Sequence, residues 1–320
     1  MTMQHGAGLA GHLRVGDEVA AAIADGRPVV ALESTLISHG FAYPDSRVIA
    51  LDSEHAIREH GAVPATVAIR DGRFVVGLSA DEIEDLATAR GVMKASRPSL
   101  AVALNRGGWA STTVSATMIA AAAAGIRVFA TGGIGGVHRG ALIDPATGAR
   151  GSMDISADLD ELGRTPVIVV CAGPKLILDV PLTIEALETR GVPVITVGTD
   201  EIPGFWAVDS GVRSPARVES VEDAAAVAAT HLDLGLGTGM LVCTPVPAAD
   251  AVLRATVERE IDAAVAEAEA SGIGGAALTP WLLARLAQRT GGATVRANLS
   301  LIRHNAEVAA DIAVRLAQTA

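Results

Sequence analysis

The sequence predicts a three-layer α/β/α fold with a central, largely parallel sheet and a helical C-terminal segment. Three observations carry this prediction. Helical patterns end at a glycine and are followed by apolar runs rich in Val and Ile. Half of the residues are hydrophobic although only 2% are aromatic, a composition that suits helices packed on a parallel sheet. No linker or low-complexity tract divides the 320 residues, so we expect one domain over 1–320, with 1–14 as a flexible extension.

Each predicted element follows from the position of its glycine or its periodicity. The glycines that end a helix before a strand are Gly26, Gly61, Gly125 and Gly191. This alternation of helix and strand is typical of βαβ units. The apolar stretch 114–130 is too short for a membrane span. It is interpreted as a buried helix followed by a strand. Further strands are expected at Leu100–Leu104, Pro166–Cys171 and Met240–Thr244.

The chain beyond Pro247 is predicted to be helical without strands. Helical periodicity covers Ala248–Ala270, Pro280–Arg289 and Val295–Ala317. We expect these helices to wrap the sheet or to contact a partner subunit.

The net charge of −11 disfavours a long polyanion or an acidic membrane as the main partner. A small phosphate needs only a local cationic pocket and stays compatible with this charge. The N-terminal segment lacks the pattern of a signal peptide, so a cytoplasmic location is expected. Cys171 and Cys243 lie in apolar, strand-like runs, where reduced, buried thiols are expected.

Lysine usage is the most informative count in the chain. Among 25 basic residues only Lys94 and Lys175 are lysines, and an amine can lose its proton whereas a guanidinium stays charged. Chance retention at the surface remains the alternative for either lysine. Lys175 follows an apolar strand, and Pro174 fits the first position of a helix. Lys175 is therefore predicted in a helical first turn, where the positive end of the helix dipole disfavours an ammonium and favours a nucleophile.

Glu33 ends the apolar strand VVALES. A carboxyl group there faces the crevice at the carboxyl ends of the strands, where open α/β sheets bind ligands. A general acid with a raised pKa and an ordinary residue that starts a helix are equally compatible with this position.

The run TGGIGGVHRG, residues 131–140, follows a predicted strand and has enough glycine for backbone amides to approach a phosphate. It fails as a dinucleotide fingerprint because His138 stands where the third glycine belongs. A phosphate-binding loop aided by His138 is the interpretation retained. Downstream, Asp154, Ser156 and Asp158 fit helix caps, and Asp154 is also an eligible ligand for Mg²⁺ or Mn²⁺.

Several long segments resemble the pseudouridine-5'-phosphate glycosidase family, also called indigoidine synthase A-like, over about residues 15–317. They are ALESTLISHG, KASR, STTVSATM, AGIRVFATGGIGGVHRG, DISADL, CAGPKLILD, VGTDEIPGFW and LTPWLLARL. The resemblance implies a single catalytic domain that reversibly cleaves pseudouridine 5'-phosphate to uracil and ribose 5-phosphate. It also implies a Mn²⁺-type cofactor, with Mg²⁺ as another candidate, and a homotrimer.

The resemblance also implies roles for individual residues. Lys175 would form a Schiff base with ring-opened ribose, and Glu33 would donate the proton. Asp154 would hold the metal. Pro174 departs from the family, which usually has another small residue there. The substrate pocket would comprise Lys94, Val114, Ser156, Ala157, Asp158, His138 and Asn298.

Two other functions are compatible with the same residues. One is a different sugar-phosphate lyase that uses a lysine Schiff base, and the other is a sensor that binds a sugar phosphate or nucleotide without turnover. A sugar kinase is disfavoured, because no motif for phosphoryl transfer accompanies the pocket.

Overall fold

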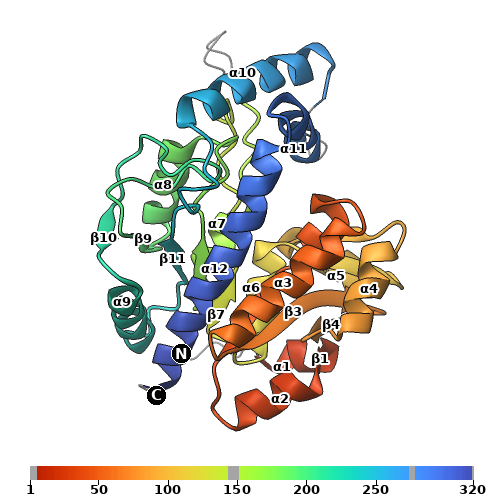
Figure 1. Cartoon of the computed structure of the whole chain (residues 1–320). Helices are drawn as coiled ribbons and strands as arrows, with labels where there is room; N and C mark the ends of the chain where they lie inside the picture. Colours follow the sequence, from red (N-terminus) through yellow and green to blue (C-terminus); the bar gives the residue numbers. More distant parts are fainter. Residues whose placement is uncertain (1–5, 143–150, 274–277, 319–320) are drawn as a thin grey trace.

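The computed structural model describes residues 6–142, 151–273 and 278–318. They form an eleven-stranded sheet with helices on both faces, which confirms the predicted α/β architecture (Figure 1). The main strand order is β1-β4-β3-β2-β7-β8-β11-β9-β10, and β6, which pairs with both β3 and β5, joins the path through β3. The strands are β1 (Leu13–Val15), β2 (Val29–Leu32), β3 (Val63–Arg70), β4 (Arg73–Val76), β5 (Met93–Ala95), β6 (Trp109–Thr112), β7 (Val128–Ala130), β8 (Ile168–Cys171), β9 (Val194–Val197), β10 (Ala216–Val218) and β11 (Met240–Cys243).

The four central strands β2, β7, β8 and β11 are neighbours and run parallel. Among the named strands of the described residues, the pairings of β3 with β4 and with β6 are antiparallel. The four glycines that were predicted to end helices all have positive φ, between +67° and +82°. Glycine adopts this conformation without a steric penalty. The prediction that these four glycines end helices that precede strands is therefore confirmed.

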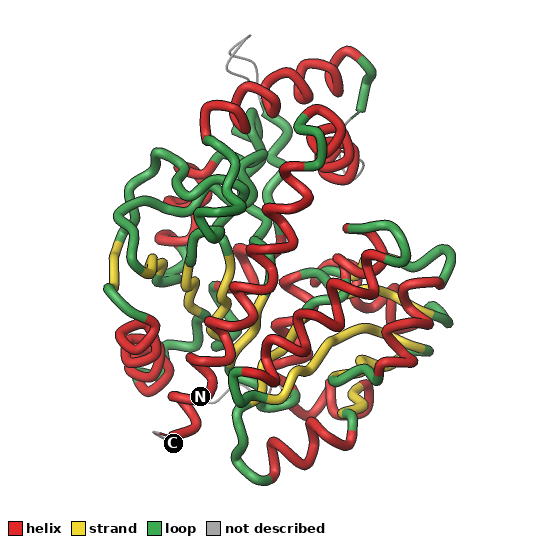
Figure 2. Tube along the Cα trace, in the orientation of Figure 1, coloured by secondary structure: helices red, strands yellow, loops and turns green. Residues whose placement is uncertain are grey.

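Helices cover both faces of the sheet. They are α1 (Gly6–Leu9), α2 (Asp17–Ala24), α3 (Asp45–Glu59), α4 (Ala80–Thr88), α5 (Leu100–Asn105), α6 (Val114–Ala123), α7 (Ala157–Leu162), α8 (Val180–Thr189), α9 (Val221–Asp233), α10 (Arg254–Ala270), α11 (Leu278–Arg289) and α12 (Ala293–Gln318), with short turns η1 (Ala10–His12), η2 (Leu36–Gly40) and η3 (Arg97–Ser99). Figure 2 shows how these helices enclose the strands.

Alternate residues of the central strands face two separate cores, as the two-residue period of a strand requires. Val30, Val128 and Val170 pack with apolar residues of α3, α9 and α12. Ala31 and Phe129 pack on the opposite face with residues of α2, α6, α7 and α8. Both faces of the parallel strands are therefore dry, which accounts for their continuous Val- and Ile-rich sequences.

The C-terminal helices confirm the predicted helical segment, and α12 wraps the sheet as expected. This helix runs across the sheet in Figure 1 and contacts β2, β7 and β8 as well as α3 and α9. Helices α10 and α11 pack against each other beyond the sheet. Because α12 contacts elements from both ends of the chain, it ties the N-terminal and C-terminal strands together.

The strand predicted over residues 100–104 is wrong. Residues 100–104 belong to α5 instead of a strand. The short turn η3, which has Pro98 within it and a reciprocal cap between Ser96 and Ser99, leads directly into that helix. Leu13 and Arg14, at the end of the segment expected to be a flexible extension, pair with β4; residues 1–5 lie outside the described part.

Cys171 and Cys243 are buried, free thiols on adjacent strands, as expected. Within the described residues, every helix is too short or too polar to serve as a membrane span.

Candidate active site

Polar side chains collect where the central parallel strands end. Glu33 follows β2, Thr131 follows β7 and Lys175 lies four residues after β8. Since these three strands are neighbours and parallel, their carboxyl ends meet at one edge of the sheet. Ligands of open α/β sheets bind at this edge.

Glu33 is partly buried and accepts a hydrogen bond from the hydroxyl group of Thr131. Desolvation raises the pKa of the Glu33 carboxyl, while the charge of Lys175 and the bond from Thr131 oppose that rise. A carboxyl group with a raised pKa keeps its proton at a higher pH than an ordinary glutamate, as a general acid requires.

The glycine-rich loop continues the pairing of β7 with β8 beyond the ends of both strands. The backbone N–H of Ala172 donates to Gly132 at 3.0 Å, that of Ile134 donates to Gly173 at 3.2 Å, and that of Lys175 donates to Ile134 at 3.3 Å. The loop therefore fixes the backbone of Lys175 directly.

Lys175 does not stand in the first turn of a helix, so this part of the prediction is wrong. Pro174 forms a parallel bridge with Ile134, and α8 begins only at Val180, where the Asp179 side chain caps the N–H of Leu182. Helix α8 therefore does not place the positive end of its dipole at Lys175.

Lys94 reaches the same site from the other half of the sheet. It lies in β5, opposite Ser111 of β6. Desolvation of the ammonium and the charge of Lys175 lower the pKa of Lys94, while Glu33 and Asp158 raise it. These mutual influences mean that both lysines and both carboxyl groups share one electrostatic environment.

Asp158 joins three segments of the site through backbone groups. Its Oδ1 accepts the N–H of Ser115 at 3.0 Å, and its Oδ2 accepts the N–H of Gly135 at 3.0 Å. Ser156 caps α7 by accepting the N–H of Asp158. The expected pocket residues Val114, Ser156, Ala157 and Asp158 are thus brought together at the start of α6 and α7.

Gly135 has no room for a side chain. A Cβ atom there would lie 2.3 Å from the Ser156 Oγ and 2.9 Å from the Asp158 Oδ2. We expect Gly135→Ala to destabilise the protein by about 1–3 kcal/mol, because the added methyl group forces the loop away from α7. Thermal unfolding followed by circular dichroism measures this effect. Gly107→Ala is the matched control, since nothing lies within 4 Å of its Cβ position; equal melting temperatures for the two variants would refute the expectation.

Asp154 and His138 form a second, smaller pair beside the loop. The Asp154 Oδ2 lies 3.8 Å from the His138 Nδ1, and the Asp154 carbonyl accepts the His138 N–H at 3.0 Å. Within the described ranges, no three His, Cys, Asp or Glu side chains are grouped as a metal site. One partly exposed carboxylate suits a cation such as Mn²⁺ or Mg²⁺ that keeps most of its waters.

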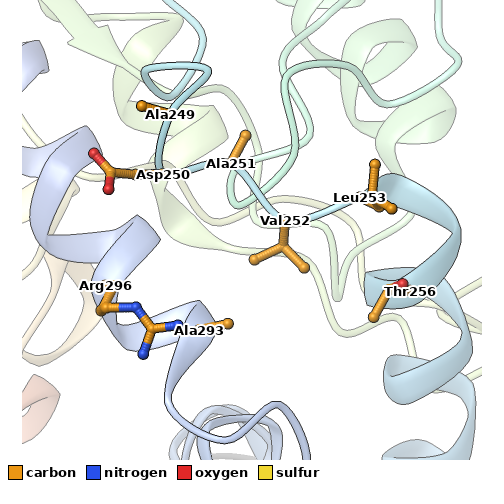
Figure 3. A pocket seen from close by; sticks show the side chains of 8 residues that line it. All are labelled: Ala249, Asp250, Ala251, Val252, Leu253, Thr256, Ala293 and Arg296. Atoms are coloured by element: carbon orange, nitrogen blue, oxygen red, sulfur yellow. The ribbon is translucent and has the colours of Figure 1, made fainter.

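Asn298 approaches the site from α12. Its Oδ1 would lie 3.7 Å from a Cβ placed on Gly132, so it borders the glycine-rich loop. A pocket of about 320 Å³ opens nearby and contains none of the predicted site residues (Figure 3). Figure 3 shows Ala293 and Arg296 of α12 facing the segment 249–253.

Two structural contributors were not singled out from the sequence. Phe205 has a positive φ of 59°, and its ring lies 2.7 Å from the Cβ position of Gly133, which explains the need for glycine there. Asn305 of α12 donates to the backbone of the glycine-rich loop. The signal for Asn305 was a polar residue within the largely apolar buried face of a long helix.

The fold and this edge define a class of α/β enzyme sites that pair a lysine with a carboxylic acid beside a glycine-rich loop. The family model described as "Indigoidine synthase A like protein" matches residues 18–315. The chain belongs to this family, and its relatives at half identity over nearly the full length show that it is an enzyme.

Relatives and solved structures agree on this assignment. Proteins named pseudouridine-5'-phosphate glycosidase from Solibacter usitatus and Deinococcus radiodurans are each 50% identical to the chain, covering 95% and 96% of it and 99% and 96% of their own lengths. The prealnumycin C-glycosynthase AlnA, solved in complex with ribulose 5-phosphate, superposes with a TM-score of 0.86 at 40% identity, over 96% of this chain and 97% of that one. An indigoidine synthase A-like protein from Thermotoga maritima gives 0.83 at 31% identity, over 99% of both chains.

Proposed function

We propose that the chain reversibly cleaves the carbon–carbon glycosidic bond of pseudouridine 5'-phosphate, giving uracil and ribose 5-phosphate, through a Schiff base on Lys175. The observation that carries the proposal is the meeting of Lys175, Glu33 and Lys94 at one sheet edge in a chain that has only two lysines. The names of the glycosidase relatives support the substrate.

The leaving atom of this substrate is a ring carbon of uracil, so protonation of an oxygen or nitrogen cannot release it as in ordinary glycosidases. The uncharged Lys175 amine bonds to the anomeric carbon of ribose as the bond from that carbon to the ring oxygen breaks. The amine proton passes to the ring oxygen, which becomes a hydroxyl group. The nitrogen lone pair is then placed to expel uracil.

Glu33 completes the cleavage by supplying a proton. The lone pair on nitrogen forms an iminium as the bond to the uracil carbon breaks, and that carbon takes its proton from Glu33. Water adds to the iminium and releases ribose 5-phosphate with the free amine. The proton left over returns to Glu33, so the net reaction consumes one water.

Lys94 is proposed to bind the phosphate of the substrate. We expect Lys94→Gln to raise KM by roughly 10- to 100-fold with little change in kcat, because a charge-assisted hydrogen bond contributes about 1.5–3 kcal/mol. Steady-state kinetics measures this change. The control is Arg90→Gln, which removes an exposed cation from the same half of the chain. An unchanged KM in Lys94→Gln would contradict the phosphate role.

Asp154 is proposed to hold Mn²⁺ or Mg²⁺, with His138 beside it. Bound there, the cation would neutralise negative charge on oxygen atoms of the substrate. We expect Asp154→Asn to weaken Mn²⁺ binding by roughly 10- to 100-fold, because it removes the only charged ligand proposed. The electron paramagnetic resonance signal of free Mn²⁺ measures binding without an activity assay. Asp160→Asn, an exposed substitution on α7, is the control; identical titrations for the two variants would reject the site.

One assay tests the substrate and the reaction together. Incubation of the purified chain with pseudouridine 5'-phosphate and Mn²⁺ is expected to release uracil. Stoichiometric binding without uracil would favour a sensor, and turnover of other sugar phosphates in its place would favour a different Schiff-base lyase. A homotrimer in the cytoplasm completes the proposal, on the strength of the family resemblance, and sedimentation equilibrium tests the assembly.

A further inference from the structure

Asn305 is a buried amide on the apolar face of α12. Its side chain is fully buried, with Leu301, Ala306 and Ala309 among its buried neighbours along the helix. Burying an amide without hydrogen bonds costs about 1–3 kcal/mol, and a leucine at this position would avoid that cost. The amide therefore needs an account beyond packing.

The amide nitrogen of Asn305 bridges two consecutive carbonyl groups. Its Nδ2 donates to the carbonyl of Thr131 at 2.8 Å and to that of Gly132 at 3.3 Å. From the other side, the N–H of Thr131 donates to Val170 of β8 at 3.0 Å. The backbone at Thr131 is thus held by a helix and by a strand where β7 passes into the glycine-rich loop.

The side chain of Thr131 transmits this restraint to the proton donor. Thr131 is 3% exposed, and its hydroxyl group donates to the Glu33 Oε1. The first side-chain torsion of a β-branched residue has few allowed values. A fixed backbone therefore fixes the direction of this hydroxyl group.

We propose that Asn305 is a positioning residue for Glu33, because its buried amide fixes the backbone of Thr131 and so aims the Thr131 hydroxyl group at the Glu33 carboxyl. The proposal rests on the role of Glu33 in the proposed function. It extends the reaction machinery to a helix that contributes Asn298 to the pocket border and Asn305 to its support.

The pKa of Glu33 reports whether this restraint is intact. Burial and the charge of Asp158 raise that pKa, whereas Lys175, the Thr131 hydroxyl group and Lys94 lower it. Loss of the aimed hydroxyl group removes one stabilising partner of the carboxylate, so the pKa of Glu33 rises further. The alkaline limb of the kcat profile, where Glu33 loses its proton, then moves to higher pH.

The experiment compares Asn305→Leu with Thr294→Val. The control removes the bond of 3.1 Å between the hydroxyl groups of Thr290 and Thr294. Thr294 is a buried polar residue near the start of α12. We expect Asn305→Leu to lower kcat about tenfold or more, since small misplacements of a catalytic group are costly, and to shift the limb to higher pH at an unchanged KM. Thr294→Val is expected to lower the melting temperature alone.

Glu33 can also be titrated without substrate, by the infrared difference between each protein and its Glu33→Gln counterpart. This separates the two proposals, because a shifted Glu33 pKa in an enzyme that releases no uracil would support the positioning role and reject the function. Thr131→Ser keeps the hydroxyl group but frees its torsion, and it is expected to shift the titration in the same direction. An unchanged pKa of Glu33 in Asn305→Leu would overturn the proposal. If Asn305→Leu does not fold, an unchanged pKa of Glu33 in Thr131→Ser would overturn it instead.

Discussion

Replacing Lys175 by arginine is expected to lower kcat by about 10⁴-fold or more, because a guanidinium remains charged at neutral pH and does not form the iminium. Arginine retains the positive charge, so a loss of this size would separate nucleophilic from electrostatic roles. The rate of uracil release from pseudouridine 5'-phosphate measures it.

Reductive trapping identifies the amine directly. Borohydride added with ribose 5-phosphate is expected to leave a stable adduct on the peptide that contains Lys175, and the chain offers only one other lysine side chain, Lys94. Lys94→Gln should still be labelled when the sugar phosphate is supplied at saturating concentration. An adduct that persists in Lys175→Arg, or that maps to Lys94, would reject the proposed nucleophile.

Replacing Glu33 by glutamine is the second large effect, an expected loss of roughly 10²- to 10⁴-fold in kcat. Glutamine keeps the shape and the acceptor oxygen for Thr131 but has no acidic proton to give to the uracil carbon. The variant should still form the borohydride adduct with ribose 5-phosphate, because Lys175 is intact. Loss of both turnover and adduct would instead indicate a collapsed site.

The pH dependence of wild-type turnover gives the sign of the Glu33 contribution. Glu33 donates only while protonated, and burial raises its pKa, so kcat should stay high above the usual glutamate range and fall as pH rises through the raised pKa. Glu54→Gln is a matched control, since burial raises the pKa of Glu54 too and its carboxyl accepts a bond of 2.6 Å from Thr66. If the alkaline limb of the kcat profile shifts in Glu54→Gln, the pH dependence of turnover cannot be assigned to Glu33.

The parallel core could be predicted because its signals are local. The helices that end at the positive-φ glycines Gly26, Gly61, Gly125 and Gly191 are each followed by a buried strand. The strand prediction at residues 100–104 failed because a short apolar run fits a strand or a buried helix equally well. In the structure the capped turn η3 leads into this segment as a helix.

The positions of Glu33 and Lys94 in one site could be suspected from residue type, but their proximity could not. Lys94 belongs to β5, which reaches the sheet only through β6 and β3, a connection without a sequence signature. The surroundings of Lys175 were misjudged for a related reason. Pro174 fits a helix start by local rules, yet its partner Ile134 lies 40 residues earlier in the chain, and this long-range pairing prevails.

Helix α12 also sets the order in which a newly made molecule becomes competent. Synthesis proceeds from the N-terminus and segments begin to fold as they emerge, so β2, β7 and β8 leave the ribosome well before residue 293. Until α12 packs on the sheet, one face of those strands is exposed to water. The hydrogen bonds from Asn305 to the backbone at Thr131 and Gly132 are also missing. A nascent chain is therefore expected to be prone to aggregation through its apolar surface. It is also expected to be catalytically inactive until α12 has been synthesised and has folded.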